Sequence, residues 1–301
     1  MNEIQRILEK GIIKPEFLVP ETICDFYVDE KRKKLWAVLL DLLHEFDKVC
    51  QRHHLRYFIS AGTLLGAIRH HGFIPWDDDI DVEMPREDYD KLIQYKDEFS
   101  LPYKYQTPET DPGYFLSFNK LRNANTSSVS VILQYAGFCQ GAFLDIFPMD
   151  SFKAETMHAK HKRIMELVLD LGTYLRIGNP ELDEKNLQRV ASYSGRDPKD
   201  TYRMLQDLFL EDKDKDCEYI GLLSCPLYDI ERMKRYKEDY AETVLVDFCG
   251  MKCPAPKGYD RVLHMQYGDY WQLPPVEGRG AWHSGIIFDM DKPYTYYLKH
   301  K

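Results

Sequence analysis

Four aspartates fall within five consecutive positions of the segment IPWDDDIDVEM, and this feature constrains the fold most: Asp77, Asp78, Asp79 and Asp81. Apolar residues surround them, so the segment is expected to be half-buried. Alternate side chains of a strand share a face, so a strand over 78–84 would turn Asp79 and Asp81 to one side and Ile80 and Val82 into the core. Two carboxylates about 4 Å apart repel by about 4 kcal/mol at an effective dielectric of 20. The pattern therefore favours a bound cation.

Three interpretations of this acidic segment remain open. It is an acidic strand end on the surface, a calcium loop, or an Asp-x-Asp metal pair at a catalytic site. Asp77, Asp79 and Asp81 match the first half of an EF-hand loop, but Val82 replaces its glycine and Asp88 its final glutamate. Hard oxygen ligands in small number suit Mg²⁺ or Mn²⁺, which favours the metal pair.

A glycine-rich turn precedes the aspartates. The segment 55–61, LRYFISA, predicts a strand, and TLLGAIRH predicts a helix that begins near Gly62 and Thr63. Backbone N–H groups at the start of a helix bind anions, so this turn is a candidate phosphate site. Gly62 and Gly66 form a Gly-x-x-x-Gly spacing. This spacing is specific only in combination with the acidic segment, in which Asp79 lies 17 positions after Gly62.

Asp145 is the lone polar residue of the apolar run AFLDIFP, within a strand expected over 141–150. A buried carboxylate is costly unless it is paired or binds a metal. We therefore expect Asp145 to join Asp79 and Asp81, although a core carboxylate bonded to backbone N–H groups is the alternative.

The rest of the chain indicates an α/β or α+β core followed by a helical half. Apolar residues at steps of three and four predict a helix over 31–52, and LSFNKLRN predicts a strand over 116–123. Residues 154–245 are charged and helix-forming, and 246–301 are rich in glycine, proline and aromatic residues. We expect an N-terminal extension (1–30), a catalytic core (31–150), and a C-terminal region (151–301) packed on that core.

Composition excludes some classes of function. The net charge of −9 argues against a nucleic-acid partner, which would need a basic surface. Seven cysteines without a signal peptide predict reduced thiols and a cytoplasmic protein. No apolar run approaches the roughly 20 residues that span a bilayer. The KRKK run at residues 31–34 is more typical of a solvated helix end than of a peripheral membrane contact, though the latter stays open.

Several motifs together resemble one family. The segments SAGTLLGAIRHHGFIPWDDDIDVEMPREDYDKL, KLRN and GAFLDIFPMD resemble the LicD family of phosphocholine transferases, with the fukutin and fukutin-related phosphopentitol transferases as more distant relatives. The tail YDRVLHMQYGDYWQLPP, followed by His283, is also similar to the family pattern. The resemblance covers most of the chain, although residues 155–240 match only in helical texture.

The resemblance implies an α+β fold with a nucleotidyltransferase-like mixed sheet. It also implies metal-dependent transfer of a phospho-alcohol from a CDP-linked donor such as CDP-choline to a hydroxyl of a cell-surface glycan or lipid-linked precursor, as in lipopolysaccharide or teichoic acid synthesis, with CMP leaving. Such an acceptor would be met at the inner face of the cell membrane. The family pattern places the metal at Asp79, Asp81 and Asp145, and the phosphate-contacting turn at Gly62, Thr63 and Gly66.

Further assignments remain open. Asp145 is also a candidate base, and Arg69, Lys120 and Arg122 are the nearest cations in sequence that would clamp a phosphate. Aromatic residues of the tail suit either a cation–π cage for choline or a core: Tyr267, Tyr270, Trp271 and Trp282. Cys249 and Cys253 suit reduced thiols better than a zinc site. The alternative functions are attack on the α-phosphate of a nucleoside triphosphate, and a catalytically inactive relative that binds glycan or metal.

Overall fold

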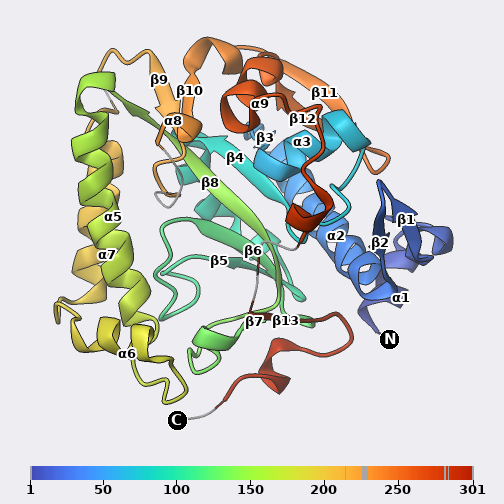
Figure 1. The fold of residues 1–301 in the computed structure, drawn as a ribbon, viewed down its shortest axis with the longest axis horizontal. Helices are drawn as coiled ribbons and strands as arrows, with labels where there is room; N and C mark the ends of the chain where they lie inside the picture. Colours follow the sequence, from blue (N-terminus) through green and yellow to red (C-terminus); the bar gives the residue numbers. More distant parts are fainter. Residues whose placement is uncertain (1, 214, 226–229, 281–282, 284, 300–301) are drawn as a thin grey trace.

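A mixed seven-stranded sheet forms the centre of the protein (Figure 1). The computed structural model describes residues 2–213, 215–225, 230–280, 283 and 285–299. The main sheet path is β10-β9-β8-β4-β3, and β6 joins β8 and carries β5. The strands are β3 Phe58–Ile59, β4 Asp81–Pro85, β5 Tyr103–Gln106, β6 Asn119–Asn123, β8 Ala142–Phe152, β9 Tyr219–Gly221 and β10 Lys234–Tyr236. Only the pairing of β4 with β8 is parallel among these strands, and the mixed sheet with its helices confirms the α+β class.

The long strand β8 organises the sheet. Its residues 142–146 pair with β6, 145–149 with β4 and 150–152 with β9. Most of β8 is buried, which agrees with the apolar run from which the sequence predicted it. Three parts of the sheet therefore meet on a single strand.

Helix α2, Glu30–Arg52, covers one side of the sheet beside α1, Glu3–Glu9 (Figure 1). The Asp29 side chain caps α2 by accepting a hydrogen bond from the Arg32 N–H at 2.8 Å. The helix predicted over 31–52 is confirmed, and the stripe expected to face the core is buried: Leu35, Leu39, Leu42, Phe46 and Val49. Two shorter helices follow along the chain, α3 Ala61–His70 and α4 Arg86–Leu92.

A second hydrophobic cluster holds the helical segment between β8 and β9. It joins α5, Met157–Tyr174, to α7, Pro198–Leu210, with α6, Glu184–Ala191, nearby. Figure 1 shows α5 and α7 on the opposite side of the molecule from α1 and α2. No helix among the described residues combines the length and the apolarity needed to cross a bilayer.

The remaining C-terminal elements pack back onto the first half of the chain, so the second half is helical only in part. The main hydrophobic core runs from Ile4 to Met290. Strand β13 pairs with β7, and α9 and the β11–β12 hairpin contact α3. The bounds of these and the other short elements are β1 Glu21–Ile23, β2 Phe26–Val28, β7 Ser127–Ser130, α8 Ile230–Met233, β11 Thr243–Phe248, β12 Met251–Pro256, α9 Tyr259–Tyr267 and β13 Ile286–Asp289.

Three strand predictions were wrong in their bounds. The strand expected over 55–61 is only β3, the strand expected over 78–84 begins at Asp81, and the strand expected over 116–123 begins at Asn119. The Asp77 N–H donates to the Ile74 carbonyl at 2.9 Å, which closes a turn, and residues 77–80 lie outside regular structure. The two-residue alternation therefore orients only Asp81, and the earlier aspartates are placed by loop contacts.

Candidate functional site

Three charged residues form a row across neighbouring strands of the sheet. Asp145 of β8 is the register partner of both Asp81 on β4 and Lys120 on β6. Directly paired residues point to the same face, so the three side chains lie beside one another. The Lys120 ammonium donates a hydrogen bond to Asp145 Oδ1, and both side chains are 7% exposed. The buried carboxylate thus has an ammonium partner.

Asp79 lies just before this row and meets a residue from the tail. His283 Nδ1 is 2.7 Å from Asp78 Oδ1, and His283 Nε2 is 3.6 Å from Asp79 Oδ2. One ligand atom from each of these three residues lies within 4.8 Å of the others. Asp79, Asp81 and Asp145 do not meet that distance as a group of three, so among the described residues the tightest candidate ligand set includes His283.

The carboxylates of this site strongly perturb one another. Burial raises the pKa of Asp79 to about 6, with the Asp145 and Asp78 charges adding to the effect and His283 opposing it. Burial and the Asp79 charge raise the pKa of Asp81 well above its usual range. Burial lowers the pKa of His283, but its hydrogen bond to Asp78 and the Asp79 charge raise it overall. The site therefore holds more negative charge than its cations balance.

This donor set fits a hard divalent cation. Asp78 Oδ2 is buried and has no hydrogen-bond partner among the described residues, and burial with the nearby Asp79 charge raises the pKa of Asp77 well above its usual range. Carboxylate oxygens in surplus, one of them orphaned, are the ligands that Mg²⁺ or Mn²⁺ takes in proteins. The residues present are therefore compatible with the predicted metal.

The glycine turn lies against the aspartate loop. A Cβ added to Gly62 would lie 2.5 Å from Asp77 Oδ2, so a side chain there would displace the carboxylate. The Asp81 N–H donates to Thr63 Oγ1 at 2.9 Å, which fixes the start of β4 against α3. The Ser60 hydroxyl donates to Glu83 Oε2 and does not cap α3. The first turn of α3 thus begins beside the carboxylates without a side-chain cap.

Comparison with known proteins shows which family part of the chain resembles. Residues 54–167 match the family model described as "LicD/FKTN/FKRP, nucleotidyltransferase domain", and this range contains the glycine turn and all three predicted metal ligands. The lipopolysaccharide cholinephosphotransferase LicD of Haemophilus influenzae is 29% identical over 252 residues, which cover 82% of this chain and 93% of that protein. Residues 54–167 are therefore similar to the LicD family, and the Haemophilus relative extends the similarity over most of the chain.

Two uncharacterised rickettsial proteins match the chain over shorter stretches. The protein of Rickettsia prowazekii is 30% identical over 109 residues, which cover 36% of this chain and 32% of that protein. The protein of Rickettsia typhi is 42% identical over 69 residues, which cover 22% of each.

Other residues that the sequence proposed for the site have partners elsewhere. Gly66 is explained by packing, because a Cβ there would lie 2.4 Å from the Gly72 carbonyl oxygen. Arg69 donates to the Tyr270 carbonyl at 2.6 Å and to His70. Arg122 is buried and donates to the Gly141 carbonyl at 2.7 Å and to a glutamine side chain. Phosphate contact by either arginine stays a prediction.

The aromatic tail and the cysteine pair are partly explained by packing. Tyr270 is buried, and its hydroxyl donates to Asp260 Oδ1 at 2.7 Å, whereas Trp271 is 58% exposed. Trp282 lies outside the described residues. All seven cysteines are free, and Cys253 is fully buried in β12. No third metal ligand joins Cys249 and Cys253 within the part of the chain described.

Sequence reasoning missed the contact between Asp78 and His283. The two residues lie 205 positions apart, and the only signal was the presence of His283 after the family-like tail. Sequence reasoning also treated Asp145 and Lys120 as separate candidates. One carboxylate in an apolar strand and one lysine in a nearby strand suggest an ion pair between them.

Proposed function

We propose that this protein transfers a phospho-alcohol, phosphocholine in the first place, from a CDP-linked donor to a hydroxyl of a lipopolysaccharide-type glycan or its lipid-linked precursor. The observation that carries the proposal is the row of Asp81, Asp145 and Lys120 beside Asp79 and the uncapped first turn of α3. The Haemophilus influenzae relative, a lipopolysaccharide cholinephosphotransferase by name, supports the choice of donor group and acceptor.

Asp79, Asp81 and Asp145 would hold Mg²⁺ or Mn²⁺, and Asp78 and His283, which have ligand atoms within 4.8 Å of one of Asp79, would supply further ligands. When bound, the ion would neutralise charge on the donor diphosphate and on the leaving CMP. The dependence of the reaction on this metal, and the nucleotidyltransferase-like character of the fold, are both part of what we propose.

The chain's own groups would do the rest. N–H groups of the first turn of α3 would receive phosphate oxygens. Lys120 lies at hydrogen-bond distance from Asp145, so its ammonium would turn to a phosphate once a cation compensates the carboxylates. Asp145 Oδ1, released from Lys120, would then accept the proton of the acceptor hydroxyl. A lipid-linked acceptor would bring the protein to the cytoplasmic face of the membrane.

Asp79→Asn and Asp81→Asn test the proposal. Each is expected to reduce CMP release from CDP-choline by about 10²- to 10³-fold, because each removes a group that supports charge neutralisation in the transition state. The fold should persist, since either change relieves repulsion among carboxylates. Asp247→Asn is the matched control, because that residue forms an exposed pair with Lys252 on the β11–β12 hairpin.

The assay supplies deacylated lipopolysaccharide core, Mg²⁺, and CDP-choline, CDP-ribitol or CDP-glycerol, and it follows CMP together with the modified glycan. Full activity of both variants would contradict the proposed site. Pyrophosphate release from a nucleoside triphosphate, without CMP release, would assign a nucleotidyltransferase instead. Binding of metal without any product would leave a binding protein.

A further inference from the structure

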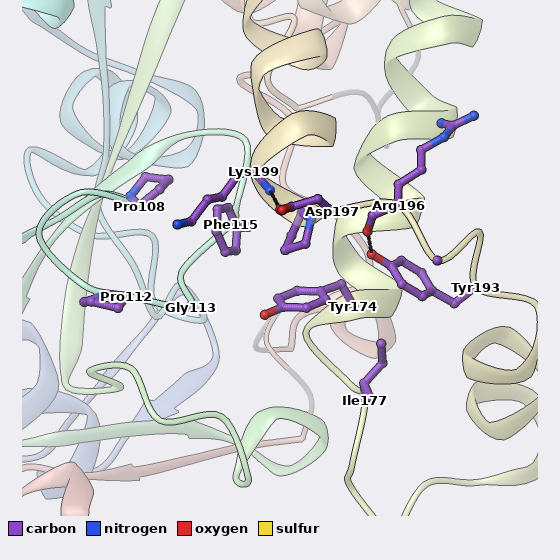
Figure 2. Close-up of a pocket in the computed structure, with 12 residues that line it drawn as sticks. Pro108, Pro112, Gly113, Phe115, Tyr174, Ile177, Tyr193, Arg196, Asp197 and Lys199 are labelled. Atoms are coloured by element: carbon purple, nitrogen blue, oxygen red, sulfur yellow. Dashed lines mark hydrogen bonds between the residues drawn. The ribbon is translucent and has the colours of Figure 1, made fainter.

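A pocket of about 710 Å³ lies at the helical side of the molecule, outside the carboxylate site (Figure 2). One wall is the loop 107–118, which carries Pro112 and Phe115. The other wall is the end of α5 with Tyr174, and the first turn of α7 with Lys199. Nothing in the proposed chemistry uses these residues.

Some polar groups of the pocket have hydrogen-bond partners within the protein, and others have none among the described residues. The Tyr193 hydroxyl donates to the Arg196 carbonyl, and Figure 2 shows the Arg196 side chain turned away from the other lining residues. The Asp197 carboxylate accepts the Lys199 N–H at 2.8 Å and so caps α7. These groups hold the wall in place.

Two groups remain for a ligand. Figure 2 shows the Lys199 ammonium extending toward Pro108 and Phe115, and the Tyr174 hydroxyl pointing toward the Gly113 side of the pocket. Neither Lys199 Nζ nor the Tyr174 hydroxyl forms an ion pair or a hydrogen bond with a described residue. Lys199 is exposed, as are other described lysines without an ion pair such as Lys185, and its position against the aromatic wall of the pocket is what sets it apart.

The chemistry of these groups selects a ligand class. Aromatic and proline rings pack against the C–H face of a sugar, and a tyrosine hydroxyl bonds to sugar hydroxyls. An unpaired ammonium favours a phosphate or carboxylate group. The combination fits an oligosaccharide that carries an anionic group.

The pocket is also within reach of the carboxylate row. Loop 107–118 leads directly into β6, so Lys120 lies five positions after Phe115, and their Cα atoms are at most about 18 Å apart. The Ser117 hydroxyl donates to the Ser224 carbonyl at 2.6 Å, which fixes the end of this loop. An oligosaccharide bound in the pocket can therefore extend toward Asp145.

We propose that this pocket is an acceptor subsite that holds a sugar unit of an anionic glycan, with Lys199 on its phosphate or carboxylate and Tyr174 on a hydroxyl. The inference rests on the proposed function. Because the subsite lies away from the reacting groups, it contributes to binding of the acceptor more than to the chemical step.

The test uses three variants of the full chain. Lys199→Met removes the ammonium, Tyr174→Phe removes only the hydroxyl and keeps the ring against Phe115, and Lys185→Met is the control, an exposed lysine of α6 outside the pocket. The probes are deacylated lipopolysaccharide core oligosaccharide and the same material after removal of its phosphates. Calorimetry measures binding, and kinetics measure KM for the phosphorylated probe, kcat, and CMP release from CDP-choline without acceptor.

Lys199→Met is expected to weaken binding of the phosphorylated probe about tenfold and to raise its KM with kcat nearly unchanged. Tyr174→Phe is expected to weaken binding of both probes severalfold, and Lys185→Met to behave as the unmodified protein. Binding of the phosphorylated probe unchanged in Lys199→Met, or equal binding of the two probes by the unmodified protein, would overturn the proposal. Absence of CMP release in the unmodified protein would refute the proposed transferase, whereas the calorimetry would still decide the pocket.

Discussion

Replacement of Lys120 by methionine tests the electrostatic balance of the carboxylate row. The Lys120 ammonium is buried on Asp145, which has Asp81 as its neighbour on the next strand. Without the ammonium, Asp145 stays buried beside another carboxylate. Loss of one partner of a buried ion pair costs about 3–5 kcal/mol. Two unit charges 4 Å apart attract by about 4 kcal/mol at an effective dielectric of 20, which gives the same size.

The expected result in metal-free buffer is therefore a loss of about 3–5 kcal/mol in the free energy of unfolding, measured by urea titration. At about 2 °C per kcal/mol, the thermal midpoint falls by about 6 °C or more. Lys252→Met is the control on the β11–β12 hairpin. Its ion pair with Asp247 is 2.8 Å long, and both side chains are more than half exposed, so its loss costs at most about 1 kcal/mol.

Addition of Mg²⁺ sharpens this test. An ion at 100 times its dissociation constant stabilises the folded protein by about 2.7 kcal/mol. The gain should be larger in Lys120→Met than in the unmodified protein, because the ammonium no longer competes for the Asp145 carboxylate. The reasoning is refuted if Lys120→Met is as stable as the unmodified protein without metal, or if Mg²⁺ stabilises both proteins equally.

Two further predictions concern helix α3. Gly66→Ala should lower the free energy of unfolding by about 1–3 kcal/mol, since its Cβ would lie 2.4 Å from the Gly72 carbonyl oxygen. Gly137→Ala is the control in urea titrations, because no atom lies within 4 Å of its Cβ. Equal stability of the two variants would contradict the packing argument. Burial and the Arg69 charge lower the pKa of His70 from 6.5 to about 4 in the folded protein. As the pH falls from about 6.5 toward about 4, the unfolded chain therefore binds a proton at His70 before the folded protein does, and the folded protein loses stability. His70→Gln should remove that part of the pH profile of the unfolding free energy, and an unchanged profile would assign it to other groups.

Local patterns in the sequence predicted the elements that bury long apolar stripes. The helix over 31–52 and the strand over 141–150 agree with α2 and β8 within two residues at each end, because their periodicities coincide with the faces that they bury. The start of β4 was predicted wrongly because a tertiary contact decides it. The Thr63 side chain accepts the Asp81 N–H, and no local pattern encodes that bond.

The candidate site was predictable in its residue types but not in its pairings. The sequence supplied Asp79, Asp81, Asp145 and Lys120, and a lone carboxylate in an apolar strand was an adequate reason to select Asp145. Strand register decides that Lys120 lies opposite Asp145, and register between strands this far apart in sequence depends on the whole sheet. The contact of His283 with Asp78 depends on the path of the tail, which composition does not determine.

The helical segment between β8 and β9 leaves the sheet and returns to it at a single place. Phe152 ends β8 and is the register partner of Tyr219, where β9 begins, so the intervening helices form an excursion whose two ends are already joined by the sheet. The entropic cost of closing such a loop grows only slowly with its length. Chains of this architecture can therefore lengthen, shorten or exchange the helical excursion, and with it one wall of the pocket, while Asp145 at the other end of β8 keeps its neighbours.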